Sequence, residues 1–125
     1  MARKKILVVE DEADVSKALE IRLNATGYQP VIAVDGEEGW NKAQSEKPDL
    51  IILDVILPKL DGYGLCNLIK KDAKTKNTPV IMLTAKGMLG DIEKGFHMGA
   101  DCYLSKPYEW DRLLQNIKKF LEKKT

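Results

Sequence analysis

The stretch Leu50-Ile51-Ile52-Leu53-Asp54 is an unbroken apolar run that ends in a carboxylate. Such a run, with β-branched residues and no polar alternation, is typical of a strand buried on both faces of a parallel sheet. Four further short apolar runs lie along the chain, at residues 6–9, 31–34, 80–83 and 102–104. The sequence therefore predicts five strands, of which the first, third and fourth have this doubly buried pattern.

The segments between these runs have the spacing of helices. Residues 13–25 place apolar residues on one face, and Gly27 follows as a stop signal. Strand–helix alternation at this pace indicates βαβ units with right-handed crossovers. The predicted fold class is a doubly wound α/β domain with a parallel sheet of five strands and with five helices. The remaining helices are expected from Asp35-Gly36 to before Pro48, and over 63–72, 91–98 and 108–123.

Length and composition exclude several classes of protein. The chain has 125 residues, 44% hydrophobic and 31% charged, which predicts one soluble globular domain. A formal charge of +1 argues against direct nucleic-acid binding by this domain. No apolar run approaches the roughly 20 residues that a membrane span needs. Cys66 and Cys102 form neither a disulfide framework nor a metal-ligand spacing, so we expect a cytoplasmic location and no membrane contact.

Polar residues with complementary chemistry follow four of the five strands. Ligands of open α/β sheets bind outside the carboxyl ends of the strands, at the topological switch point. Taken singly, each of these residues is equally explained as a turn former, a helix cap or a solvated loop residue. Their conjunction at one edge of the sheet favours a site. The residues are Glu10-Asp11-Glu12, Asp54, Thr84-Ala85 and Ser105-Lys106-Pro107.

These residue types favour magnesium-dependent phosphoryl chemistry. Neighbouring carboxylates repel one another unless a cation joins them, and an all-oxygen donor set favours Mg²⁺. A carboxylate such as Asp54 can act as a nucleophile toward phosphorus. Lys106 and Mg²⁺ would then neutralise the transferring phosphoryl group, which is most of what phosphoryl transfer requires. Thr84 can hydrogen-bond a phosphoryl oxygen, and the small Ala85 leaves the approach open.

In order and position, these pieces resemble the receiver domain of two-component response regulators, of the chemotaxis-regulator kind. The resemblance runs from about Lys4 to Leu121, and it implies a receiver domain over residues 1–125. It also implies a flavodoxin-like (βα)5 fold with strand order 2-1-3-4-5. The fragments that carry the resemblance are 6–12, 48–54, Leu57-Pro58 with Asp61-Gly62, 80–85, Gly99-Ala100-Asp101 and Lys106-Pro107.

The resemblance implies a role for each site residue. Asp54 is matched to the phosphoacceptor, and Glu10 and Asp11 are matched to the acidic pair that holds Mg²⁺. Asp54 and the backbone carbonyl of Ile56 would complete the ligand set. Thr84 is matched to the switch hydroxyl and Lys106 to the lysine that contacts the phosphoryl group. Tyr103 falls at the rotameric switch aromatic, although a partly buried strand aromatic explains it equally well, and Pro107 would follow a cis peptide bond.

The function implied is that of a signalling switch rather than a metabolic enzyme. A sensor histidine kinase or phosphotransfer protein would phosphorylate Asp54, and the domain would catalyse its own phosphorylation and slow autodephosphorylation. The surface of the fourth helix, fifth strand and fifth helix would then bind a downstream output protein or domain. An aspartyl phosphatase is the main alternative, but such hydrolases place a second Asp where Ile56 stands. The chain can be a stand-alone receiver or the N-terminal part of a longer regulator.

Several residues depart from the common pattern of this family. Glu10 replaces a frequent Asp, and Cys102 stands where many DNA-binding regulators have a second Asp used in dimer salt bridges. Ile56 and Lys86 occupy two positions that often tune the lifetime of the phosphoryl group. We expect the branched Ile56 to hinder the attacking water. Trp110 is assigned either to the core or to the output surface, and both assignments stay open.

Overall fold

The computed structural model describes residues 3–84 and 99–122. The predicted helix over 91–98, together with Ala85 and Lys86, lies outside these ranges. The strands are β1 (Lys5–Val9), β2 (Gln29–Ala33), β3 (Leu50–Asp54), β4 (Val80–Thr84) and β5 (Cys102–Ser105). The helices are α1 (Ala13–Ala25), α2 (Gly36–Ser45), α3 (Gly62–Lys71) and α5 (Trp110–Leu121). No described helix has the length and apolar composition of a membrane-spanning segment.

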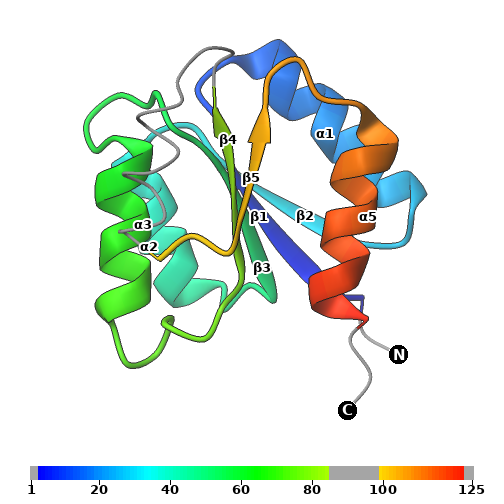
Figure 1. The fold of residues 1–125 in the computed structure, drawn as a ribbon. Helices are drawn as coiled ribbons and strands as arrows, with labels where there is room; N and C mark the ends of the chain where they lie inside the picture. Colours follow the sequence, from blue (N-terminus) through cyan, green and yellow to red (C-terminus); the bar gives the residue numbers. More distant parts are fainter. Residues whose placement is uncertain (1–2, 85–98, 123–125) are drawn as a thin grey trace.

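The five strands form one parallel sheet in the order β2-β1-β3-β4-β5, as predicted. Helices α2 and α3 cover one face of the sheet, and α1 and α5 cover the other (Figure 1). Every residue of β3 is therefore buried, which explains why its sequence is continuously apolar. The side chains of the sheet alternate between two core clusters, one under each pair of helices. This arrangement confirms the doubly wound α/β class.

The edge strand β2 begins earlier than its apolar run predicts. Gln29 pairs with Lys5 and Ala33 pairs with Val9, so the register with β1 sets both ends of the strand. Val34 lies beyond the strand, and its side chain is 51% exposed. Pro30 fits within β2 because an edge strand can lack one backbone donor. The predicted span of 31–34 was therefore two residues too late at its start and one too long at its end.

The helix boundaries follow local signals. Asp35 and Asp61 cap α2 and α3, since their carboxylates accept hydrogen bonds from Glu38 N and Gly64 N, both at 2.8 Å. Helix α1 ends at Ala25, and Gly27 follows with a φ of +92°, as expected for a stop signal. The last helix starts at Trp110 rather than at residue 108, because Glu109 has an extended backbone. The Lys106–Pro107 peptide bond is cis, as the resemblance implied.

Candidate functional site

The site is built at the carboxyl ends of β1 and β3, where the order of strands reverses. Val9 pairs with Leu53, so the residues that follow on the two strands, Glu10 and Asp54, are neighbours. Both carboxyl groups are buried, with Glu10 1% and Asp54 6% exposed. Two adjacent buried acids are costly in a fold unless a proton or a cation lies between them. The switch point thus carries two buried carboxyl groups that require a proton or a cation between them.

Lys106 supplies one positive charge to this pair. It follows β5, and its ammonium group forms an ion pair with Asp54 Oδ2. The other oxygen of Asp54 accepts a hydrogen bond of 3.0 Å from the backbone N–H of Ile56. Partial burial opposes the charged form of Lys106, but the bond to Asp54 and the nearby acids raise its pKa above the usual value. Asp54 is therefore held by one contact on each oxygen.

Glu10 is the least satisfied group of the site. Its Oε1 accepts a hydrogen bond of 3.2 Å from Glu12 N. Its Oε2 is buried and accepts no hydrogen bond from any residue in the described part of the chain. Burial and, next, the adjoining Asp54 carboxylate together raise the pKa of Glu10 to about 8, against the opposing charge of Lys106. An oxygen in this state can be satisfied by a proton or by a metal ion.

The residues present fit Mg²⁺. Across residues 3–84 and 99–122, no three His, Cys, Asp or Glu side chains are gathered closely enough to hold a metal on their own. Mg²⁺ usually takes only one or two carboxylates directly and keeps several waters. The unsatisfied Oε2 of Glu10 beside Asp54 meets that requirement. The backbone carbonyl of Ile56 and the carboxylate of Asp11 are further oxygen donors at the same edge of the sheet.

The other predicted site residues are placed as follows. Asp11 is exposed at the start of the loop that leads into α1. Thr84 ends β4 in register with Ser105, and its side chain lies outside the described part of the structure. Tyr103 of β5 is half-buried against the core on the α3 side of the sheet, and its hydroxyl oxygen is buried. The structure thus brings Glu10, Asp54 and Lys106 together.

Gly62 packs directly behind Asp54, and Gly36 packs against the loop that follows β3; the sequence pattern assigned neither role. A Cβ on Gly62 would lie 2.3 Å from the backbone oxygen of Asp54, and a Cβ on Gly36 would lie 1.8 Å from that of Leu60. Gly62 N also donates a 2.8 Å hydrogen bond to Val55 O. The only local sequence signal for this close packing is a glycine directly after a capping aspartate. The close approach itself depends on how distant loops cross.

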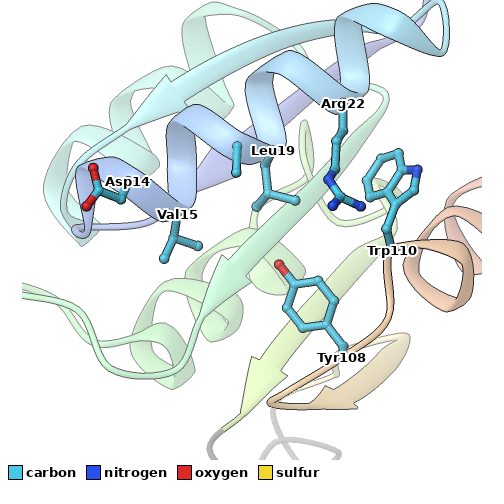
Figure 2. A pocket seen from close by; sticks show the side chains of 7 residues that line it. Asp14, Val15, Leu19, Arg22, Tyr108 and Trp110 are labelled. Atoms are coloured by element: carbon cyan, nitrogen blue, oxygen red, sulfur yellow. The ribbon is translucent and has the colours of Figure 1, made fainter.

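A groove of about 370 Å³ runs between α1 and the start of α5 (Figure 2). The guanidinium of Arg22 lies 5.4 Å from the centroid of the Trp110 ring. Trp110 is partly buried against the cluster under α1 and α5, as is Tyr108. Trp110 thus contributes to the core, which is one of its two predicted assignments. Trp40 packs against the opposite cluster.

Fold and site together define a class: a parallel α/β protein with a buried acidic pair and a lysine at the switch point of its sheet. The sequence pattern of the family described as the response regulator receiver domain matches residues 6–118. The chain therefore belongs to the response regulator receiver domain family.

Individual relatives agree with this assignment. The chain is 46% identical over 121 residues to "Probable transcriptional regulator ycf27" of Guillardia theta, covering 97% of this chain and 46% of the relative. It is 40% identical over 119 residues to the DNA-binding dual master transcriptional regulator RpaA of Synechocystis, covering 95% and 49%. The chain thus spans about half the length of the curated relatives it matches.

A solved structure is similar over nearly the whole chain. It is the receiver domain of the sensor histidine kinase PA1611 from Pseudomonas aeruginosa, with a magnesium ion coordinated in its active-site cleft. The TM-score is 0.89 at 30% identity, covering 98% of this chain and 100% of that one.

Proposed function

We propose that this chain is a cytoplasmic phosphoacceptor switch that takes a phosphoryl group onto Asp54 from a histidine kinase or a phosphotransfer protein. The observation that carries the proposal is the arrangement of Asp54. It is buried at the end of β3, paired with Lys106, and next to Glu10, whose Oε2 has no hydrogen-bond donor among the described residues. The family assignment supports the same reading.

In the proposed reaction, a carboxylate oxygen of Asp54 attacks phosphorus and the bond between phosphorus and the donor nitrogen breaks. The N–H of Ile56 and the ammonium of Lys106 orient the carboxylate, since each contacts one oxygen. Lys106 then neutralises charge on the phosphoryl oxygens, and Thr84 supplies a hydroxyl to one of them. Mg²⁺, when held by Glu10, Asp54, Asp11 and the Ile56 carbonyl, supplies further charge neutralisation.

The new charge would shift the balance between two packings of the chain. A phosphoryl group adds negative charge and strong acceptor oxygens next to Lys106. Thr84 and Tyr103 would respond, and the surface that includes β5 and α5 would bind the output protein or domain. Named relatives such as RpaA are transcriptional regulators, which supports transcription as the downstream process. In this proposal the receiver itself does not contact nucleic acid.

Incubation with acetyl phosphate and Mg²⁺ tests the assignment by intact-mass measurement. We expect one phosphoryl adduct on the parent chain and none on Asp54→Asn, because the amide lacks the nucleophilic oxygen. Asp111→Asn, which changes an exposed carboxylate at the start of α5, is the matched control and keeps the adduct. An equal adduct on Asp54→Asn, or none on the parent, would overturn the proposal.

The side chain of Ile56 sets the lifetime of the phosphoryl group in this proposal. It is 64% exposed beside Asp54, where its branched apolar atoms can hinder an attacking water. We expect Ile56→Asn to hydrolyse the phosphoryl group about 10-fold faster, a change of roughly 1.4 kcal/mol in the barrier. The decay of the adduct after removal of acetyl phosphate measures this. Ile21→Asn, a similar exposed change on α1, should leave the rate unaltered; an unchanged or slower decay in Ile56→Asn contradicts the hypothesis.

A further inference from the structure

The loop between β3 and α3, residues 55–61, contains a strained turn at its tip. Lys59 has a φ of +68°, in the left-handed region that residues other than glycine rarely adopt. Leu60 N donates a 2.8 Å hydrogen bond to Pro58 O, which closes a three-residue turn around Lys59. Such a conformation raises the free energy of the fold, so it persists only where neighbouring contacts hold it.

The contacts that hold this turn come from the start of α2. Pro58 O accepts a second hydrogen bond, of 3.2 Å, from Gly36 N. The Lys59 ammonium lies 3.6 Å from Asp35 Oδ2. The other oxygen of Asp35, Oδ1, caps α2 by accepting the 2.8 Å hydrogen bond from Glu38 N. One carboxylate thus serves the helix with one oxygen and the loop with the other.

The ion pair joins a shielded carboxylate to a lysine that lies largely in solvent. The side chain of Asp35 is 15% exposed and that of Lys59 is 63% exposed. A carboxylate with little water around it gains more from a nearby cation than an exposed one does, because the attraction is screened less. The turn also packs directly on α2, since a Cβ on Gly36 would lie 1.8 Å from Leu60 O. The pair therefore acts where the two segments already touch.

The same loop carries the main chain of Ile56, which faces the proposed phosphoacceptor. Ile56 N donates the 3.0 Å hydrogen bond to Asp54 Oδ1, and its carbonyl is one of the proposed Mg²⁺ donors. The loop is closed at its base by the hydrogen bond from Gly62 N to Val55 O. Ile56 therefore lies between this closed base and the tip that is held by α2.

We propose that Lys59 is a positioning residue that holds the tip of this loop against the start of α2 through its ion pair with Asp35. The main chain of Ile56 is thereby kept in its bond to Asp54. Without the ion pair, the strained turn can relax, and this part of the loop opens more often. Leu57 stays buried in the core, so the change is local. The consequence for Mg²⁺ and phosphoryl transfer rests on the proposed function, whereas the effect on the loop does not.

The test is amide hydrogen exchange of the metal-free chain, measured by NMR for each residue. We expect Lys59→Met to speed exchange at Ile56 N about threefold, in keeping with the modest strength of a partly exposed ion pair. Lys59→Arg keeps the charge and should exchange at the parent rate. Exchange at Glu38 N should stay unchanged in both variants, because Asp35 Oδ1 still caps α2.

A double variant tests whether Lys59 acts through Asp35. Asp35→Asn keeps an oxygen that can cap α2 and removes the negative charge, so it should speed exchange at Ile56 N as much as Lys59→Met does. Adding Lys59→Met to Asp35→Asn should then produce no further increase. Multiplied increases in the double variant would overturn the assignment of this ion pair.

Lys71→Met is the matched control, since it removes the same charge from an exposed lysine of α3. Exchange at Ile56 N should keep the parent rate in this variant. The proposal is overturned by no increase in Lys59→Met, by an equal increase in Lys71→Met, or by an equal increase in Lys59→Arg. Mass measurement after acetyl phosphate and Mg²⁺ is a separate readout: absence of the adduct on the parent overturns phosphorylation of Asp54 and leaves the exchange result standing.

Discussion

Gly62→Ala is expected to destabilise the chain by roughly 2–3 kcal/mol, because the new methyl group would overlap backbone atoms that cannot move separately. The added Cβ would lie 2.3 Å from the oxygen of Asp54 and 2.7 Å from the Cα of Val55. Relief requires that the start of α3 and the end of β3 separate, which also breaks the hydrogen bond from Gly62 N to Val55 O. Urea unfolding measures the loss.

The same substitution should also slow phosphorylation of Asp54 in the chains that remain folded. A displacement of about 1 Å at a reacting group can reduce its rate by up to about 100-fold. The rate of adduct formation with acetyl phosphate, under conditions where both chains are folded, measures this effect. Gly64→Ala is the control, since its Cβ would press only on the end of the flexible Leu60 side chain, at 2.9 Å, and would lie in ordinary contact with Asp61 Oδ1, at 3.5 Å. Equal stability of the two variants would contradict the expected clash.

Glu10→Gln is expected to stabilise the chain in the absence of metal by about 1–3 kcal/mol at pH 8.5, because it removes a buried charge with an unsatisfied oxygen. The amide keeps the acceptor for Glu12 N and places a donor next to Asp54. Mg²⁺ should raise the melting temperature of the parent and barely change that of the variant, because the variant lacks one of the two buried carboxylates.

The pH dependence of stability provides a second readout of Glu10. Its folded pKa of about 8 lies above the ordinary value of 4.5, so the folded state binds more protons than the unfolded state between these values. The contribution of Glu10 to the stability of the metal-free parent therefore falls as pH rises from about 4.5 to about 8, and this contribution is absent in Glu10→Gln. Glu12→Gln, the same change at an exposed neighbour, should behave like the parent. A parallel pH profile for all three chains would contradict the burial of an unpaired Glu10 carboxyl.

Much of the fold could be predicted because the strands carry their own signal. β1, β3 and β4 are buried on both faces, so their apolar runs are continuous and their ends are sharp. Asp35 caps α2 through a bond to a residue three positions away, so the local sequence placed the start of that helix, whereas Asp61 was not predicted as the cap of α3. β2 was placed less well, since the ends of an edge strand depend on its register with β1 and not on its own apolar residues.

The chain order alone determined that acidic residues and a lysine gather at one edge of a parallel sheet, because every strand of such a sheet ends on the same side. Only the tertiary structure decided which of these acidic side chains is buried at the site and which is exposed to solvent. Glu10 and Asp11 are adjacent in sequence, yet Glu10 is buried beside Asp54 and Asp11 is exposed, since the register of β1 with β3 selects the carboxyl that turns inward. The need for glycine at position 62 was likewise decided there, because it arises from the close approach of α3 to the end of β3.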